Sequence, residues 1–322
     1  LDLTNKITDI SGGNYEKTVA VGEPVTTVAD NPATPDVTTL TLTATDTVAE
    51  GGKITYTATL SNPAGTALNV KLSNGETITI AAGQKEGSIT IDAPSDDVYI
   101  DAGTVQAKID GTTGGDFELL ATSGAYAVTK VSDTIDHTGL SLSATPTVAE
   151  GGQITYTATL TNKAGTDMTI KLSNGAVISI DAGKLSGSVT VPAPADDVYK
   201  DAGKVEVTIK DATGGNFENL VPSTVPAVTE VTDTIDTSTV KLTADTTVAE
   251  GGTVTYTATV GAPVTGSPVV VTLANGQNIT IEVGKTTGTV TTTAPNDALT
   301  GHAPLTNSIT NVTGGNYENL VA

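Results

Sequence analysis

The sequence contains no cysteine, no tryptophan and no arginine, and only two phenylalanines. Without cysteine there can be no disulfide, no thiolate metal site and no cysteine nucleophile. Aromatic residues make up 3% of the chain, which is little material for stacking sugars or nucleic-acid bases. No run of about 18 apolar residues occurs, so the sequence predicts no insertion into a membrane. No signal-peptide pattern opens the chain.

The charge is strongly one-sided. The chain carries 36 acidic residues against 15 lysines, which gives a net charge of −21. Such a surface repels nucleic acid and anionic membranes, so we expect neither as a partner. It suits an extracellular chain or one that binds cations. Threonine, valine, isoleucine and glycine dominate the rest, and this composition is typical of strands and turns.

One stretch of sequence occurs three times. Thr47–Leu60 returns as Thr147–Leu160 and again as Thr247–Val260, at a spacing of 100 residues. A fixed period of this kind predicts a tandem array of similar domains. We expect residues 1–36 to be the tail of a preceding repeat plus a linker, residues 37–136 and 137–236 to be two full repeats, and residues 237–322 to be a third repeat without its last strand.

Within each repeat, apolar and polar residues alternate with a period of two, which indicates half-buried strands. The first repeat has seven such stretches and no helical periodicity. They are residues 40–44, 54–60, 68–72, 76–80, 88–91, 105–109 and 126–131. The pattern predicts an all-β fold of tandem immunoglobulin-like β-sandwich domains, each of about 100 residues, in a linear array.

Acidic residues recur at three fixed places: the turn before the second strand, the loop after the fifth strand, and the segment after the last strand. Following the strands up and down a sandwich puts these three places at one end of each domain, where it meets the next. The predicted cation ligands are Glu50, Asp96, Asp97, Asp101, Asp133 and Asp136 in the first repeat, Glu150, Asp196, Asp197, Asp201, Asp233 and Asp236 in the second, and Glu250 and Asp297 in the third.

Crowded carboxylates repel one another unless a cation joins them, and Ca²⁺ is the usual hard cation for an all-oxygen site. The sequence therefore predicts a Ca²⁺ site at each joint. An alternative for Asp101 and Asp201 is that they simply begin the next strand. The alternative is ordinary solvated surface acid. In the third repeat Asn296 and Ala298 stand where the second has Asp196 and Val198, so any site there is expected to be weaker.

Other chemistries lack their residues. His137 and His302 are isolated, which argues against a zinc site or a catalytic base. Asp96 and Asp97 are neighbours in one loop, which does not suit glycosidase chemistry. The Gly-Gly-Asn-Phe-Glu motif at residues 214–218 is interpreted as a turn at the opposite end of the domain. We expect no enzymatic activity.

Three stretches of the second repeat resemble a known family: Val148–Leu160, Pro194–Val198 and Thr213–Glu218. They are similar to the tandem extender repeats of giant bacterial RTX-type biofilm adhesins, the large-adhesion-protein group. A weaker similarity is to Calx-β domains, which share the Glu-Gly turn and the Asp-Asp loop. The resemblance implies ligand roles for Glu50, Asp96, Asp97, Glu150, Asp196 and Asp197.

The resemblance implies a secreted, Ca²⁺-rigidified rod at the bacterial cell surface that projects adhesive modules for attachment and biofilm formation. Its partners would be the neighbouring repeats of the same array. Two alternatives stay open. Residues 25–30 read as a stray strand that could complete the third repeat of another copy, as in a filament built by strand donation; the simpler explanation is a window on a longer array. The chain could also be a ligand-binding adhesin module.

Overall fold

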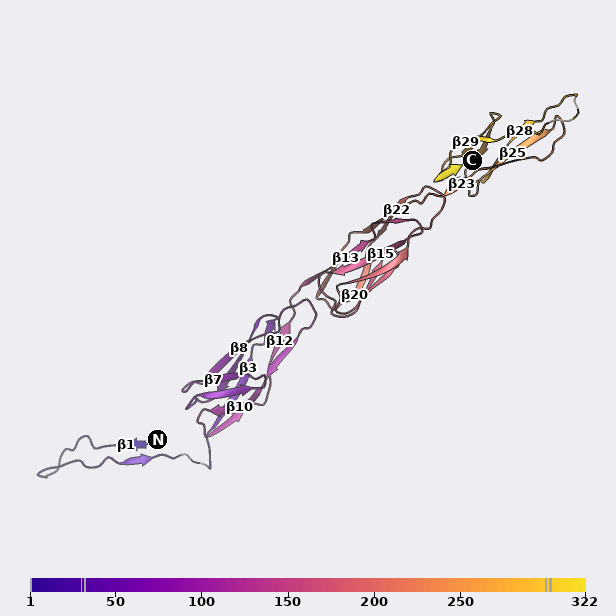
Figure 1. Cartoon of the computed structure of the whole chain (residues 1–322). Coiled ribbons are helices and arrows are strands. Elements are labelled where there is room, and N and C mark those ends of the chain that lie inside the picture. The colour runs from indigo at the N-terminus through magenta and orange to yellow at the C-terminus, as the bar shows by residue number, and fades with distance from the viewer. Residues whose placement is uncertain (1, 30, 32, 299, 301–302) are drawn as a thin grey trace. The chain divides into compact units, whose positions relative to one another are not determined.

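The computed structural model describes residues 2–29, 31, 33–298, 300 and 303–322. Every regular element in this part of the chain is a β-strand (Figure 1). The chain divides into two units, Leu1–Ile135 and Asp136–Ala322. The predicted all-β, immunoglobulin-like sandwich class is confirmed. Asp30, at the end of one predicted strand, and His302 lie outside the described residues.

The first repeat, in the first unit, is a sandwich of two layers. One layer is a four-stranded sheet in the order β11-β3-β5-β8. The other contains two three-stranded sheets, β4-β12-β9 and β10-β6-β7, which are connected because β9 leads directly into β10. The strands are β3 (Val37–Ala44), β4 (Thr47–Ala49), β5 (Lys53–Leu60), β6 (Leu68–Leu72), β7 (Thr77–Ile80), β8 (Glu86–Asp92), β9 (Gly103–Ala107), β10 (Ile109–Gly114), β11 (Leu119–Thr122) and β12 (Ala127–Ser132).

The second repeat, in the second unit, has the same strands in the same order of pairing. They are β13 (His137–Ala144), β14 (Thr147–Ala149), β15 (Gln153–Leu160), β16 (Met168–Leu172), β17 (Val177–Ile180), β18 (Ser186–Pro192), β19 (Gly203–Val207), β20 (Ile209–Gly214), β21 (Asn219–Pro222) and β22 (Ala227–Thr232).

The described residues of the third repeat form fewer strands. They are β23 (Thr237–Thr239), β24 (Lys241–Ala244), β25 (Thr253–Thr259), β26 (Val269–Leu273), β27 (Asn278–Ile281), β28 (Thr287–Thr293), β29 (Ile309–Thr313) and β30 (Asn319–Val321). Among its described residues, no sheet corresponds to β4-β12-β9 of the first repeat.

The core of each repeat follows from the alternation in its second long strand. In β5, Ile54, Tyr56, Ala58 and Leu60 are buried, while the residues between them face outward. These side chains pack against buried residues of β6 and β7 in the other layer, such as Val70. Alternation places one face of each strand in the core, so the period-two pattern of the sequence determines which residues are inside.

The structure differs from the predicted strands at the end of each repeat. The stretch predicted over residues 105–109 is interrupted: β9 ends at Ala107, and β10 begins at Ile109 with a register shift before Gly111. The short strand β11 was not predicted. It pairs in parallel with β3, whereas the following strand, β12, pairs in parallel with β4 in the other layer. The chain thus crosses from one layer to the other between β11 and β12.

The N-terminal segment forms a small hairpin of its own. The strands β1 (Asp2–Thr4) and β2 (Val25–Thr27) pair antiparallel, and every residue of both strands is exposed. The strand predicted over residues 25–30 is therefore seen as β2, which ends at Thr27.

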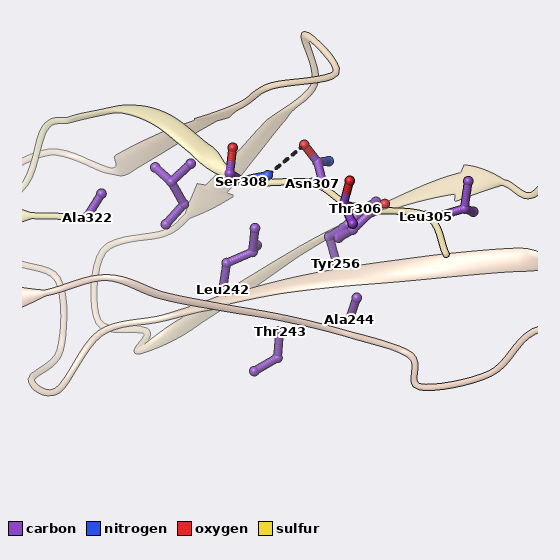
Figure 2. A pocket seen from close by; sticks show the side chains of 10 residues that line it. Leu242, Thr243, Ala244, Tyr256, Leu305, Thr306, Asn307, Ser308 and Ala322 are labelled. Carbon is purple, nitrogen blue, oxygen red and sulfur yellow. Dashed lines mark hydrogen bonds between the residues drawn. The ribbon is translucent and has the colours of Figure 1, made fainter. Parts of the chain in front are cut away.

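The third repeat has an open slot. A cavity of about 510 Å³ lies between β24–β25 and the segment 305–309 (Figure 2). Its lining includes Leu242, Tyr256, Ile309 and Ala322. Tyr56 and Tyr156, the counterparts of Tyr256, are completely buried, while Tyr256 retains 5% exposure. The segment 305–309 occupies the sequence position of residues 105–109, which include the end of β9 and the start of β10 in the first repeat.

The glycine after each acidic turn has a testable role. A β-carbon on Gly52 would lie 2.4 Å from Val48 Cγ2 and 2.9 Å from the Ala49 carbonyl oxygen. We expect Gly52→Ala to destabilise the first repeat by about 1–3 kcal/mol, because the turn must shift. Gly111→Ala is the matched control, since nothing lies within 4 Å of its β-carbon position. Hydrogen exchange of the β5 amides measures both; equal protection in the two variants contradicts the prediction.

Candidate metal centre

The turn that carries Glu50 is fixed by its own glycines and by two distant segments. Gly51 has φ +66°, a conformation that residues with a β-carbon seldom adopt. The Glu50 amide donates a hydrogen bond to the Ser132 carbonyl (3.0 Å), and the Gly51 amide donates one to the Pro94 carbonyl (2.7 Å). The turn is therefore fastened both to the end of β12 and to the loop after β8.

The second repeat builds the same turn. The Glu150 amide donates to the Thr232 carbonyl (3.1 Å), and the Gly151 amide donates to the Pro194 carbonyl (2.7 Å). Gly151 has φ +68°. The local geometry is thus a property of the repeated sequence and is not particular to one copy.

A group of three carboxylates forms where these segments meet. Glu50, Asp101 and Asp133 each place one carboxylate oxygen within 4.8 Å of the others. Glu50 is only 7% exposed. Its Oε2 and the Asp133 Oδ1 are buried, and neither has a hydrogen-bond partner among the described residues. Burial leaves these oxygens without the water that would normally solvate them, at a cost in free energy.

The crowding changes the acidity of the buried glutamate. Burial raises the pKa of Glu50 to about 7, and the hydrogen bond and charge of Asp101 act in the same direction. The charges of Asp133 and Asp97 add to the effect. A carboxyl surrounded by negative charge holds its proton more tightly, and a bound cation would reverse this effect.

Asp96 and Asp97 lie in the same loop as Asp101, but their side chains make different contacts. Asp97 Oδ1 accepts a hydrogen bond from the Tyr99 amide (2.7 Å), and Asp96 Oδ1 accepts one from the Thr134 hydroxyl. These bonds order the loop and tie it to the segment after β12. In this structure neither residue belongs to the group of three.

In the second unit the group of carboxylates draws on two repeats. Glu150 and Asp233 of the second repeat lie with Glu318 of the third, again with one oxygen each within 4.8 Å. Glu150 is 7% exposed, and its Oε2 is buried without a partner in the described part of the chain. The hydrogen bond with Asp201 and burial raise the pKa of Glu150 to about 7. The Asp201 amide donates to Asp233 Oδ1 (3.3 Å).

Glu318 is held in place by the start of its own repeat. Its Oε2 accepts a hydrogen bond from the Asp236 amide (2.6 Å), while its Oε1 is buried with no partner among described atoms. The same bond occurs in the other repeats, from the Asp136 amide to Glu218 (2.7 Å) and from the Asp36 amide to Glu118 (2.7 Å). Glu318 thus positions the linker with its Oε2, while its Oε1 remains available to bind a cation.

The sequence pattern does not identify Glu318 as a candidate ligand, because its Gly-Gly-Asn-Tyr-Glu motif is interpreted as a turn at the far end of the domain. The motif does lie in a turn, with Gly314 at φ +86° and Gly315 at φ +70°. However, this end of the third repeat lies next to the second repeat, where Glu318 meets Glu150 and Asp233. The signal that could have found Glu318 is the constant position of this acid in all three repeats.

Asp136 and Asp236, which the sequence predicts as ligands, donate hydrogen bonds through their backbone amides to Glu218 and Glu318. Neither residue belongs to a group of three. Asp196 accepts a hydrogen bond from the Thr234 hydroxyl, and Asp197 accepts one from the Tyr199 amide (2.7 Å). These two acids therefore repeat the roles of Asp96 and Asp97.

The third repeat departs from the pattern. Glu250 and Asp297 are both exposed, and neither joins a group of three within the described ranges. Asn296 lies beside Gly251, where Asp96 and Asp196 lie beside Gly51 and Gly151. The repeat therefore lacks both the burial and the charge of the other two sites.

The donor set of the two groups fits a hard cation. All six side chains are carboxylates, and such oxygen ligands suit Ca²⁺, Mg²⁺ or Mn²⁺ rather than zinc. The buried oxygens without partners are the ones that an ion would satisfy. Ca²⁺ tolerates irregular coordination best of the three, which suits a site assembled from a turn, a loop and a linker.

Several comparisons place the chain among known proteins. Residues 36–134, 136–234 and 236–322 each match the LapA domain. No curated protein matches. A solved structure described as a tetra-tandem repeat in the extending region of a large adhesion protein is 17% identical, with a TM-score of 0.34; the match covers 81% of this chain and 66% of that one. In the described residues, no helix is long and apolar enough to cross a membrane. The three matches together span nearly all of residues 36–322, well over half of the sequence, and the chain belongs to the LapA domain family.

Proposed function

We propose that this chain is a non-enzymatic extender segment of a bacterial cell-surface adhesin. In this proposal Ca²⁺ at the joints stiffens the array, which holds adhesive modules away from the cell for attachment and biofilm formation. The observation that carries it is the carboxylate group of Glu150, Asp233 and Glu318, which takes its members from two consecutive repeats. Membership of the LapA domain family supports the adhesin setting.

The mechanism is electrostatic. Without a cation, the like charges at the joint repel one another, and the loop, the turn and the linker are free to separate. One divalent ion bound by Glu150, Asp233 and Glu318 would connect both repeats and remove the repulsion. Within the first unit, Glu50, Asp101 and Asp133 would hold an ion in the same way. Asp96, Asp97 and their counterparts Asp196 and Asp197 would support the loop that brings the ligands together.

A cation that binds only the folded chain stabilises it by mass action. We expect saturating Ca²⁺ to stabilise the chain by about 2.7 kcal/mol at a free concentration 100 times the dissociation constant. The double variant Glu150→Gln, Asp233→Asn should lose the part of this gain that belongs to the second unit. Calorimetric titration and thermal unfolding, each with Ca²⁺ and with a chelator, measure the effect.

Asp181→Asn is the matched control, because Asp181 is exposed and belongs to neither carboxylate group. It removes one charge and should keep the full response to Ca²⁺. If the chain unfolds at the same temperature with and without Ca²⁺, and titration shows no binding, the proposed cation sites do not exist.

The raised glutamate pKa values predict how the metal-free chain responds to pH. Glu50 and Glu150 have a pKa of about 7 in the folded chain, against an ordinary value of 4.5. The folded state therefore binds more protons than the unfolded state between these values, so stability falls as pH rises through this window. With a chelator present, the free energy of unfolding should be greater at pH 5 than at pH 8. The variant Glu50→Gln, Glu150→Gln should flatten the dependence, and an unchanged slope would refute the assignment.

A second candidate function is assembly by strand donation between copies. The exposed strand β2 favours it, because its sequence matches that of β12 and β22, which close one side of the first two repeats. Those strands contain Val128-Thr129-Lys130-Val131 and Val228-Thr229-Glu230-Val231, and residues 25–28 have the matching sequence Val-Thr-Thr-Val. Thr129 and Thr229 are fully buried, so a donated strand would place Thr26 inward.

Sizing chromatography over a range of concentrations tests this candidate. If copies complement one another, the chain should form concentration-dependent oligomers, and Thr26→Lys should restore the monomer because a buried site cannot accept the charge. Val19→Lys is the control, since Val19 is 63% exposed and lies outside the matching sequence. A chain that stays monomeric at every concentration excludes strand donation.

A further inference from the structure

The second unit contains an interface between the second and third repeats that does not depend on carboxylates. The segment 198–200 of the second repeat lies antiparallel to the segment 316–318 of the third, with Tyr199 opposite Tyr317. The Lys200 amide donates to the Asn316 carbonyl (3.0 Å), and the Glu318 amide donates to the Val198 carbonyl (3.1 Å). A short piece of β-ladder therefore joins the two repeats.

The two tyrosines at this interface pack against each other. Their ring centroids are 5.5 Å apart with an interplanar angle of 32°. The Tyr199 hydroxyl donates to the Pro263 carbonyl (2.5 Å), and the Tyr317 hydroxyl donates to the Ala262 carbonyl (2.6 Å). Both hydroxyls thus bind the same loop of the third repeat, and the polar ends of two largely apolar side chains are satisfied.

Tyr199 belongs to the second repeat, yet it contributes to the core of the third. Tyr317 is 3% exposed and is a member of that core, and both Val198 and Tyr199 pack against it as partly buried residues. The third repeat also has an exposed acidic turn. Its apolar core is therefore extended by side chains that come from its neighbour.

The docking segment and the carboxylate group share the same short stretches of chain. Asp197 and Asp201 lie two residues to either side of Tyr199, and Asp197 accepts the hydrogen bond from the Tyr199 amide. Glu318 directly follows Tyr317. Whatever orders the acidic loop therefore also orders the segment that packs on the third repeat.

We propose that Val198 and Tyr199 form a docking surface of the second repeat that completes the core of the third, and that this surface links the stability of the third repeat to cation binding at the joint. The second clause rests on the proposed Ca²⁺ site, whereas the docking itself does not. In this way Tyr199 would add to the effect of Ca²⁺ on the third repeat, whose side chain in the proposed site is Glu318.

Hydrogen exchange on the full chain, with Ca²⁺ and with a chelator, tests both parts. Tyr199→Ala should speed exchange of the β25 amides in the third repeat at least about tenfold under both conditions, because a packed aromatic side chain is lost. Exchange of the β15 amides in the second repeat should change less than about twofold. Tyr126→Ala is the control, because Tyr126 is 50% exposed and lies in the first repeat.

Tyr199→Phe covers the case in which the alanine variant unfolds both repeats. It removes only the hydrogen bond to Pro263 and should speed β25 exchange about fivefold, the effect of one such bond. Unchanged β25 protection in both variants overturns the docking proposal.

The response to the metal separates the two proposals. Ca²⁺ should slow β25 exchange more in the unmodified chain than in Tyr199→Ala, in which Glu318 still connects the third repeat to the ion. Titration should still detect binding to that variant. If Ca²⁺ binds and slows β25 exchange equally in both chains, the link through Tyr199 is wrong. If Ca²⁺ binds to neither chain, the proposed function fails, and the effect of Tyr199→Ala in chelator still decides the docking.

Discussion

The site depends on a constraint of the backbone: each acidic turn is attached to two other segments of its repeat and cannot move away from them. The amides of Glu50 and Gly51 bind the end of β12 and the loop after β8, and those of Glu150 and Gly151 do the same in the second repeat. The carboxylates that converge there therefore repel one another within a fold that keeps them together. Burial strengthens the repulsion because less water screens it. A fold of this kind keeps unfavourable charge in place at the candidate metal centre, and local conflicts with stability are expected where a protein carries out its function.

Much of the fold could be predicted from the sequence because its determinants are local. The alternation in residues 53–60 identifies the buried face of β5 from side-chain spacing alone, and the Gly-Gly pair marks the turn before it. The recurrence of the same block at intervals of 100 residues identifies the number of similar sandwiches. Glu50 could be singled out because it is the one charged residue in an otherwise small and apolar turn.

The rest depends on contacts between segments far apart in the sequence. The crossing from β11 to β12 follows from parallel pairing with β3 and β4, which strand propensity does not specify. Glu318 was missed because its role appears only when two repeats are considered together. From the sequence, Asp101 could also simply begin the next strand. The structure places it with Glu50 and Asp133, while Asp96 and Asp97 accept hydrogen bonds from Thr134 and Tyr99. The roles of neighbouring acids in one loop are set by the direction of each side chain, which the sequence pattern does not reveal.

The parallel pairing of β4 with β12 also determines how a repeat bears mechanical load. Thr47–Ala49 lies beside Lys130–Ser132, and β14 lies beside β22 in the same way. One strand of each pair is near the start of its repeat and the other is near its end. When the two ends of a repeat are pulled apart, parallel neighbours slide along each other, so their hydrogen bonds are strained together instead of opening one after another. A chain with this arrangement resists tension through shear.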